Sequence, residues 1–165
     1  LPTPFHFMFR GGDETFANRI SPPGDWLAYA GHRAIDIIHS VGGRINGLPI
    51  YSVSDGRVLR ASTWENYGET VYVQSENHRL LYAHLQVGSY EVVLGQFITT
   101  ANKLGKAGNS PGYYVVRDEK GNVIYDEDGN AVTAYMSPHL HFEVRNKDGT
   151  DRLNPRHFFP EKVFD

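Results

Sequence analysis

Four polar side chains stand at spacings that could build a metal site. His139 and His141 are two residues apart in the stretch SPHLHFEV, and His32 and Asp36 are four residues apart in HRAID. Residues two apart on a strand share a face, with backbones about 7 Å apart, so the two imidazoles would lie side by side. Imidazole nitrogens and carboxylate oxygens suit zinc, and a catalytic zinc takes three protein ligands and keeps one position for water. His32, Asp36 and either His139 or His141 would supply these three ligands.

A further histidine lies in the stretch LLYAHL. Strict alternation along a strand would place His84 on the same face as Leu80 and Tyr82, opposite Leu81 and Ala83. His84 could then approach the same groove as the other polar residues. Each motif occurs often by chance, but their joint presence in one chain is much more specific.

The spacing of the remaining histidines and acidic residues gives weaker evidence of a functional role. Glu143 shares the predicted face of His139 and His141, and we expect it to form a structural pair rather than to act in catalysis. The residues from Asp126 resemble the start of a calcium-binding EF-hand loop, but Ala131 occupies the position that requires glycine, so we expect an ordinary turn. No direct role is predicted for the histidines at four other positions: His6, His39, His78 and His157.

The elements that would position these residues are predicted to be short strands. The chain has 17 glycines and 9 prolines between short apolar runs, and helical periodicity is weak. This pattern predicts a mainly β domain with an antiparallel sheet of about six to eight strands and few or no long helices. Asp55-Gly56 lies between β-type residues and predicts a hairpin, and Glu69–Leu85 reads as two strands around a turn near Glu76–His78. Because β-branched residues follow Ala34, we expect Asp36 on a strand entered through a turn.

Composition excludes several classes of protein. The 165 residues are 40% hydrophobic and 21% charged, which fits one globular domain. The net charge is −3 without a basic block, which argues against a nucleic-acid partner. No apolar run approaches the ~18 residues of a membrane-spanning segment. The absence of cysteine excludes disulfides, thiolate zinc ligands and a cysteine nucleophile. The N-terminal stretch lacks the features of a signal peptide, and since it begins with leucine we expect a fragment or a processed product.

The chain is predicted to divide into an irregular N-terminal arm, residues 1–30, and one domain, residues 31–165. Within the domain, Asp118–Ile124 (DEKGNVI) is echoed eight residues later by Asp126–Val132 (DEDGNAV). Each copy has a turn followed by β-forming residues. We therefore expect residues 112–136 to form a hairpin-rich insertion that leaves the core and returns at SPHLHFEV.

In this order along the chain, the motifs GHRAIDI, YAHL, VVLGQFITTANKLGKAGNS and PHLHFEV resemble the lysostaphin-like (LytM-type) zinc metalloendopeptidases. The resemblance runs from about Gly31 to Phe159. It implies a compact antiparallel β-sheet fold of the duplicated-hybrid-motif type with an open groove. It also implies hydrolysis of stem or cross-bridge peptides of bacterial peptidoglycan, and action outside the cytoplasm, as a secreted, envelope or phage protein.

The resemblance also implies a role for each of five residues. The zinc ligands would be His32, Asp36 and His141, with one Zn²⁺ per chain. The catalytic histidines beside the metal would be His84 and His139, and which of them is the general base and which stabilises the oxyanion stays open. We expect a monomer or a part of a larger chain.

The chain departs from the family pattern at two places. Ala34 stands where many relatives have glycine, which is a small change. The segment before PHLHFEV is much longer than in relatives, which leaves the cleaved bond open. The alternatives are a non-catalytic zinc-binding cell-wall or regulatory module on the same fold, a zinc enzyme with another substrate, and a lipoyl- or biotinyl-type carrier. The carrier reading is weak, because the predicted Asp55–Arg57 hairpin lacks a modifiable lysine.

Overall fold

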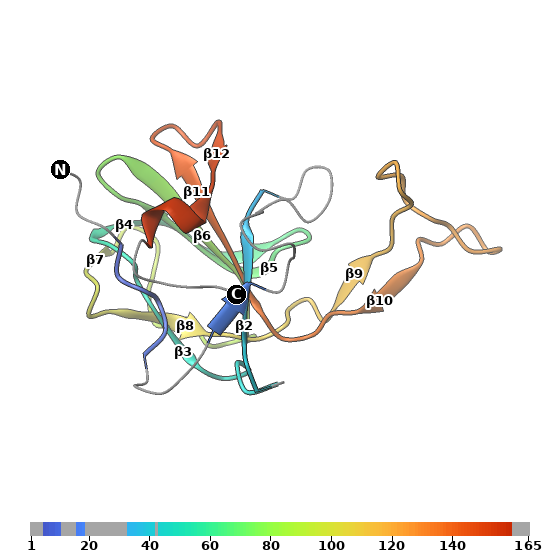
Figure 1. Cartoon of the computed structure of the whole chain (residues 1–165), viewed down its shortest axis with the longest axis horizontal. Helices are drawn as coiled ribbons and strands as arrows, with labels where there is room; N and C mark the ends of the chain where they lie inside the picture. The colour runs from blue at the N-terminus through green and yellow to red at the C-terminus, as the bar shows by residue number, and fades with distance from the viewer. Residues whose placement is uncertain (1–4, 11–15, 19–32, 42, 160–165) are drawn as a thin grey trace.

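The computed structural model describes residues 5–10, 16–18, 33–41 and 43–159 (Figure 1). Its largest element is an antiparallel sheet of eight strands in the order β1-β2-β11-β6-β5-β4-β7, with β12 paired to β11. The strands of this sheet are β1 (Phe16–Asn18), β2 (Ile35–His39), β4 (Gly56–Trp64), β5 (Gly68–Gln74), β6 (His78–Leu85), β7 (Phe97–Ile98), β11 (Leu140–Asn146) and β12 (Arg152–Leu153).

Two small antiparallel sheets and one short helix complete the described structure. β3 (Pro49–Tyr51) pairs with β8 (Lys103–Lys106), and β9 (Tyr113–Val115) pairs with β10 (Thr133–Tyr135). The 3-10 helix η1 (Pro155–Phe158) begins after Asn154, whose side chain accepts a hydrogen bond from the Arg156 backbone. The predicted mainly β, antiparallel fold without long helices is confirmed. Among the described residues, no helix is long and apolar enough to cross a membrane.

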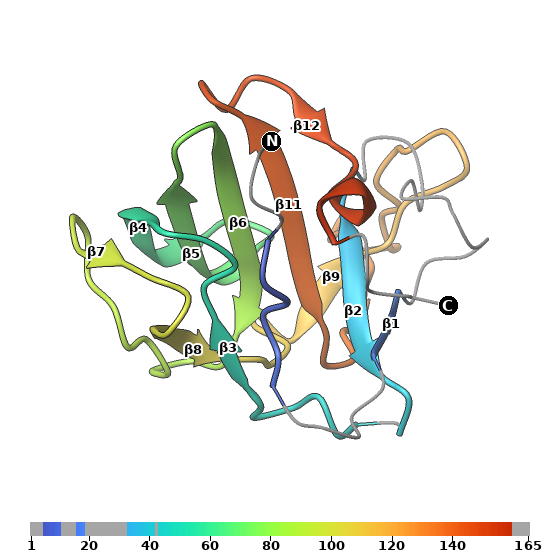
Figure 2. The ribbon, with the colours of Figure 1, turned by 60° about the vertical axis from the view of Figure 1, so that its left-hand side comes forward.

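The main core lies on one face of the large sheet. β11 contributes Leu140, Phe142 and Val144 to it, as the alternation of the sequence predicted, and β6 contributes Leu80 and Tyr82. Figure 2 shows the N-terminal segment, β3 and η1 in front of this face. They cover it with further buried side chains, among them Met8, Phe9, Ile50 and Phe159.

The opposite face carries a smaller apolar cluster and the polar residues of interest. Tyr72, Leu81 and Ala83 form the buried part of this cluster, and Leu59, Trp64 and Tyr67 pack against it. On β11, His141 lies opposite Ala83 and Glu143 lies opposite Leu81. The sheet therefore separates an apolar face from a face with titratable side chains.

The prediction of a hairpin at Asp55-Gly56 is wrong. β3, which precedes this dipeptide, pairs with β8, while β4, which follows it, pairs with β5 and β7. The chain crosses here from the small sheet to the large one, and the Val53 backbone donates a hydrogen bond to the hydroxyl of buried Tyr82 (3.0 Å). Burial against the core, rather than the turn, selects the strand partners. The two strands predicted around Glu76–His78 are confirmed as the antiparallel pair β5 and β6.

Residues 112–136, here called the arm, leave the body as a long projection that contains β9 and β10 (Figure 1). The arm extends away from the side on which β3, β8 and η1 cover the main core. Its two sequence repeats form similar turns, because the Asp118 carboxylate accepts backbone hydrogen bonds from Lys120 and Asn122, and Asp126 accepts them from Asp128 and Asn130.

Candidate functional site

Strand register brings Asp36 and His141 together. β2 and β11 are antiparallel neighbours in which these two residues are direct partners, so their side chains share a face. His141 Nδ1 lies 3.2 Å from Asp36 Oδ1, and both residues are buried. The prediction that Asp36 lies on a strand is confirmed, since β2 runs from Ile35 to His39.

His139 lies at the entrance to β11 on the same side. Its backbone N–H donates to the Gly108 carbonyl (3.1 Å). Its ring Nδ1 lies 2.8 Å from the Ser137 carbonyl oxygen, which can only accept, so we assign the ring proton to Nδ1. His139 Nε2 then points toward Asp36, 3.7 Å from Oδ2.

His84 reaches this site through an irregularity in β6, so its predicted face is wrong. Leu80 and Tyr82 lie in the main core, whereas His84 packs against the histidines on the other face. Val71 pairs with Tyr82 and Glu69 pairs with Leu85, which leaves two residues of β6 opposite one residue of β5. This β-bulge holds His84 at a φ of 65°, and it reverses the face of the side chain.

Three imidazoles meet on the site face of the sheet. The His84 ring centroid lies 4.7 Å from that of His139 and 5.7 Å from that of His141. His84 Nδ1 donates to the Ser110 carbonyl (2.8 Å), which leaves its Nε2 without the proton in the neutral ring. Burial, and then the nearby charges of His139 and His141, lower the pKa of His84 to about 3, so its imidazole is neutral at physiological pH.

A buried carboxylate orients His141 from behind. Glu143 Oε2 lies 2.7 Å from His141 Nε2 and accepts a hydrogen bond from the Tyr67 hydroxyl (2.7 Å). Its other oxygen accepts from Arg145 Nε (2.9 Å), and Arg152 lies 4.0 Å from Oε2. Burial alone would raise the pKa of Glu143, but the hydrogen bond to His141 and its charge, with the charge of Arg145, lower it to about 2.

The pairing of Glu143 with Arg145 agrees with the structural role expected for Glu143, but its contact with His141 was not predicted. The i, i+2 spacing of His141 and Glu143 on one strand could have indicated this contact. Tyr67 was also missed. It lies in the turn between β4 and β5, where no periodicity relates it to Glu143 on β11.

Two of the three predicted ligands lie in the described structure, and His141 Nδ1 and the Asp36 carboxylate are donors of the kinds that zinc binds. Burial would lower the pKa of His141, but hydrogen bonds and charges from Asp36 and Glu143 raise it to about 9. The same two carboxylates that favour a proton on this ring favour a cation at Nδ1, and a ligating histidine commonly donates its second nitrogen to a carboxylate. His32, the third predicted ligand, lies outside the described residues. Within the described ranges, no group of three or more histidine or acidic side chains could hold a metal ion.

The other residues weighed from the sequence lie elsewhere. His78 packs edge-on against Phe5 and Phe158, and His39 packs edge-on against Phe16. His6 and His157 are exposed. Asp126 makes the ordinary turn that was expected, with its carboxylate bonded to backbone N–H groups.

The fold and this cluster define an antiparallel β protein with an aspartate and three histidines on one sheet face. The model of peptidase family M23 matches residues 30–155, so the chain belongs to that family. This agrees with the predicted lysostaphin-like resemblance.

One curated relative is Endolysin 2638A of Staphylococcus phage 2638A, which is 30% identical over 118 residues. The match covers 71% of this chain and 19% of the endolysin, so the chain spans about a fifth of that relative's length.

Solved structures share the fold. The catalytic domain of the antimicrobial peptidase lysostaphin from Staphylococcus simulans is 19% identical, with a TM-score of 0.53 over 90% of this chain and 92% of that domain. A zinc-containing peptidase from Vibrio cholerae is 17% identical, with a TM-score of 0.55 over 93% of this chain and 39% of that one. At these identities the likeness establishes the shared fold.

Proposed function

We propose that this chain is a zinc-dependent endopeptidase that hydrolyses peptide bonds in the stem or cross-bridge peptides of bacterial peptidoglycan. The observation that carries the proposal is the convergence of Asp36, His84, His139 and His141 on one face of the sheet, in a chain of peptidase family M23.

His32, Asp36 and His141 are proposed to hold one zinc ion. Glu143 would fix the His141 ring so that Nδ1 faces the ion, as its 2.7 Å contact with Nε2 indicates. When bound, zinc lowers the pKa of its water to about 7 and polarises the scissile carbonyl.

His84 and His139 are proposed to share the proton transfers of hydrolysis. Each ring is anchored through Nδ1 to a backbone carbonyl, of Ser110 or of Ser137. The working atom of each ring is therefore Nε2. The ring that takes the proton of the attacking water at Nε2 becomes an imidazolium, and it can then give that proton to the leaving amine. The other ring would donate a hydrogen bond to the oxyanion only in its protonated form, in which Nε2 also carries a proton.

The proposed substrate rests on the family and on the relatives. Family resemblance implies peptidoglycan peptides, and the relatives include a phage endolysin and an antimicrobial peptidase. On the same family resemblance, we propose that the chain acts outside the cytoplasm. We also propose that it acts as a monomer or as part of a larger chain.

We also propose that residues 31–165 form the peptidase domain, with residues 112–136 as an insertion. The described part of the N-terminal segment packs on this domain, since Met8 and Phe9 lie in the main core and β1 pairs with β2, so the irregular arm expected for residues 1–30 is wrong there.

The proposal is tested by metal analysis and wall hydrolysis on the same preparations. We expect about one zinc per wild-type chain, and loss of both zinc and hydrolysis in His141→Ala. His157→Ala, which removes an exposed histidine, is the matched control and should keep both. A folded wild type that takes up no zinc on reconstitution would refute the zinc enzyme. Zinc binding without hydrolysis of any wall type would favour the non-catalytic module.

A further inference from the structure

The arm is rooted in the segments that hold two of the site histidines. At its root, the Met136 N–H donates to the Gly112 carbonyl (3.1 Å), and Asn109 Nδ2 donates to the Met136 carbonyl (2.9 Å). Just before the arm, the Ser110 carbonyl accepts the hydrogen bond of His84. Just after it comes His139. A long substrate bound at the site would therefore pass the base of the arm.

The arm exposes aromatic side chains without having a core of its own. None of residues 112–135 is buried. The exposed fractions of four tyrosines are 51% for Tyr113, 50% for Tyr114, 64% for Tyr125 and 70% for Tyr135. Tyr113 and Tyr135 are direct cross-strand partners, so their rings lie on one face of the β9–β10 hairpin. An exposed aromatic surface of this kind is typical of a binding site.

The backbone of the arm is held by its own hydrogen bonds. Val116 N–H donates to the Val132 carbonyl (2.8 Å), Val132 N–H donates to Ile124 (2.8 Å), and Ile124 N–H donates to Val116 (3.1 Å). This closed ring joins the β9–β10 hairpin to the two hairpins formed by the sequence repeats. The arm thus presents its tyrosines on an ordered frame, which lowers the entropy lost on binding.

A hollow of about 320 Å³ lies at the root of the arm. Three carboxamide side chains line it, those of Asn46, Gln86 and Asn109, together with Val87, which is 79% exposed. Carboxamides both donate and accept hydrogen bonds. Polar amides beside an apolar side chain match an acetamido group, which has one amide and one methyl.

We propose that the arm and this hollow bind the N-acetylated glycan strand of the wall polymer whose peptides the site cleaves. Tyrosine rings of β9 and β10 would stack on the apolar faces of sugar rings, with their hydroxyls bonded to sugar hydroxyls. This inference rests on the proposed function for the source of the glycan.

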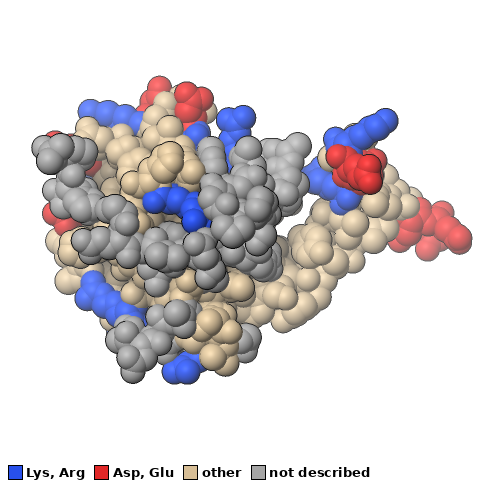
Figure 3. Space-filling model, viewed as in Figure 1, with Lys and Arg blue, Asp and Glu red and all other residues tan. Residues whose placement is uncertain are grey.

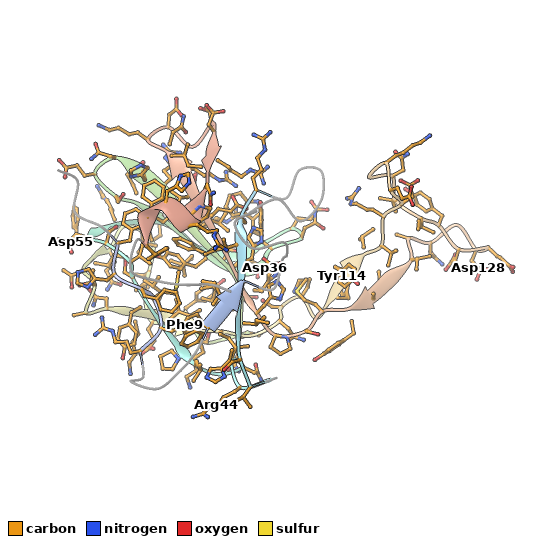
Figure 4. All side chains as sticks on the ribbon, in the orientation of Figure 1. Phe9, Asp36, Arg44, Asp55, Tyr114 and Asp128 are labelled. Carbon is orange, nitrogen blue, oxygen red and sulfur yellow. The ribbon has the colours of Figure 1, made fainter. Side chains whose placement is uncertain are left out.

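The charge of the arm disfavours an anionic polymer. It carries five acidic and two basic residues, and Figure 3 shows acidic side chains at its far end. Figure 4 places Asp128 at that end and Tyr114 nearer the body. Phosphate-rich polymers would be repelled, whereas N-acetylhexosamine rings carry no charge.

The test uses peptide-free β-1,4-linked N-acetylglucosamine oligomers, with binding measured by titration calorimetry. Wild type should bind saturably, and Tyr113→Ala/Tyr135→Ala should bind at least about tenfold more weakly, a loss of about 1.4 kcal/mol. Tyr113→Phe/Tyr135→Phe keeps the rings and should retain most of the affinity. Phe97→Ala, which removes another exposed aromatic ring on the edge strand β7, is the matched control and should bind like wild type.

Two outcomes would overturn the glycan site: no saturable binding by wild type, or equal binding by the Tyr→Ala double variant. His141→Ala should bind the oligomers like wild type in the same titration, because glycan binding does not require catalysis. This variant therefore separates this inference from the proposed function. Cleavage of a sugar-free cross-link peptide should be unchanged in Tyr113→Ala/Tyr135→Ala, while KM on intact wall should rise. If wild type cleaves neither substrate but binds the oligomers, the proposed function fails and the glycan site stands.

Discussion

Glu143 is a fully buried carboxylate in direct contact with a proposed zinc ligand. A buried charge is tolerated only when its oxygens are paired, and both oxygens of Glu143 are paired here, by His141, Tyr67 and Arg145. The network connects β11 to the turn before β5. It therefore fixes the His141 ring relative to two parts of the sheet.

Glu143→Gln is expected to weaken zinc binding by about 10- to 100-fold, because the amide keeps the shape but removes the negative charge behind His141. Zinc affinity would be measured by competition with a chromophoric chelator. Glu119→Gln, on the exposed arm, is the control and should leave the affinity unchanged. Equal zinc affinity in Glu143→Gln and wild type would contradict the orienting role.

His84→Ala is expected to retain zinc and to lose about 10²–10⁴ in the rate of hydrolysis, as for a general acid or base. Its ring packs against the other site histidines, and it is not a predicted ligand. Steady-state kinetics and metal content on one preparation check both parts. The exposed His6 provides the control variant His6→Ala. Full activity on wall substrate would exclude His84 from the mechanism.

At the scale of elements, the bulge in β6 and the turn before β5 shape the site together. The bulge directs His84 to the Ser110 carbonyl, and Ser110 Oγ accepts a hydrogen bond from the Glu69 backbone (2.9 Å). Gly68 lies directly against Ser110 with a φ of 66°, so a Cβ there would collide with the Ser110 backbone. The anchor of His84 thus depends on a glycine in the neighbouring strand.

Gly68→Ala is expected to lower the free energy of unfolding by about 1–3 kcal/mol more than Gly129→Ala does. Both glycines have positive φ, but a Cβ at Gly129 would meet nothing within 4 Å. The difference in stability between the two variants therefore measures the cost of the collision, because the cost of a side chain at positive φ is common to both. Urea unfolding measures it, and the rate of hydrolysis should fall only in Gly68→Ala. Equal stability of the two variants would show that Ser110 moves away without cost.

At the scale of the whole molecule, the two faces of the large sheet have different roles. One face packs the main core and the other bears the site. The arm lies outside this arrangement, since none of residues 112–135 is buried. Shortening the arm should therefore leave the stability of the rest of the fold nearly unchanged.

Replacing residues 113–135 by Asn-Gly, which favours a two-residue hairpin, should leave Tm within about 4 °C of wild type. Gly112 and Met136 are already hydrogen-bonded, so a short turn can join them. Differential scanning calorimetry measures the change, and the variant should keep its zinc. A fall in Tm of more than about 10 °C would mean that the arm supports the fold.

Removing zinc should lower the Tm of the wild type by about 8 °C or more. Binding at a thousandfold excess over Kd stabilises a fold by about 4 kcal/mol, and each kcal/mol moves Tm by about 2–4 °C at this size. Thermal scans with and without a chelator test this. His141→Ala should show no response, and a similar response in that variant would place the stabilising zinc at another site.

Much of this arrangement could be predicted from local patterns. Alternation in SPHLHFEV predicted that Leu140, Phe142 and Val144 face the core and that His141 and Glu143 face away from it, because strand geometry alone decides this. Turn signals predicted the β5–β6 pair. Motif order predicted the family, and with it the candidate site residues, since chemistry restricts the residue types at such a site.

Tertiary structure decided what depends on contacts between distant segments. It placed His84 on the site face, because a bulge opposite β5 overrides alternation. It paired β3 with β8 rather than with β4, because core burial outweighs the Asp55-Gly56 turn. It also brought Tyr67 from a turn to Glu143 on β11, 76 positions along the chain. A residue's own neighbours in sequence set its local conformation, but only the packed sheet determines which distant atoms it meets.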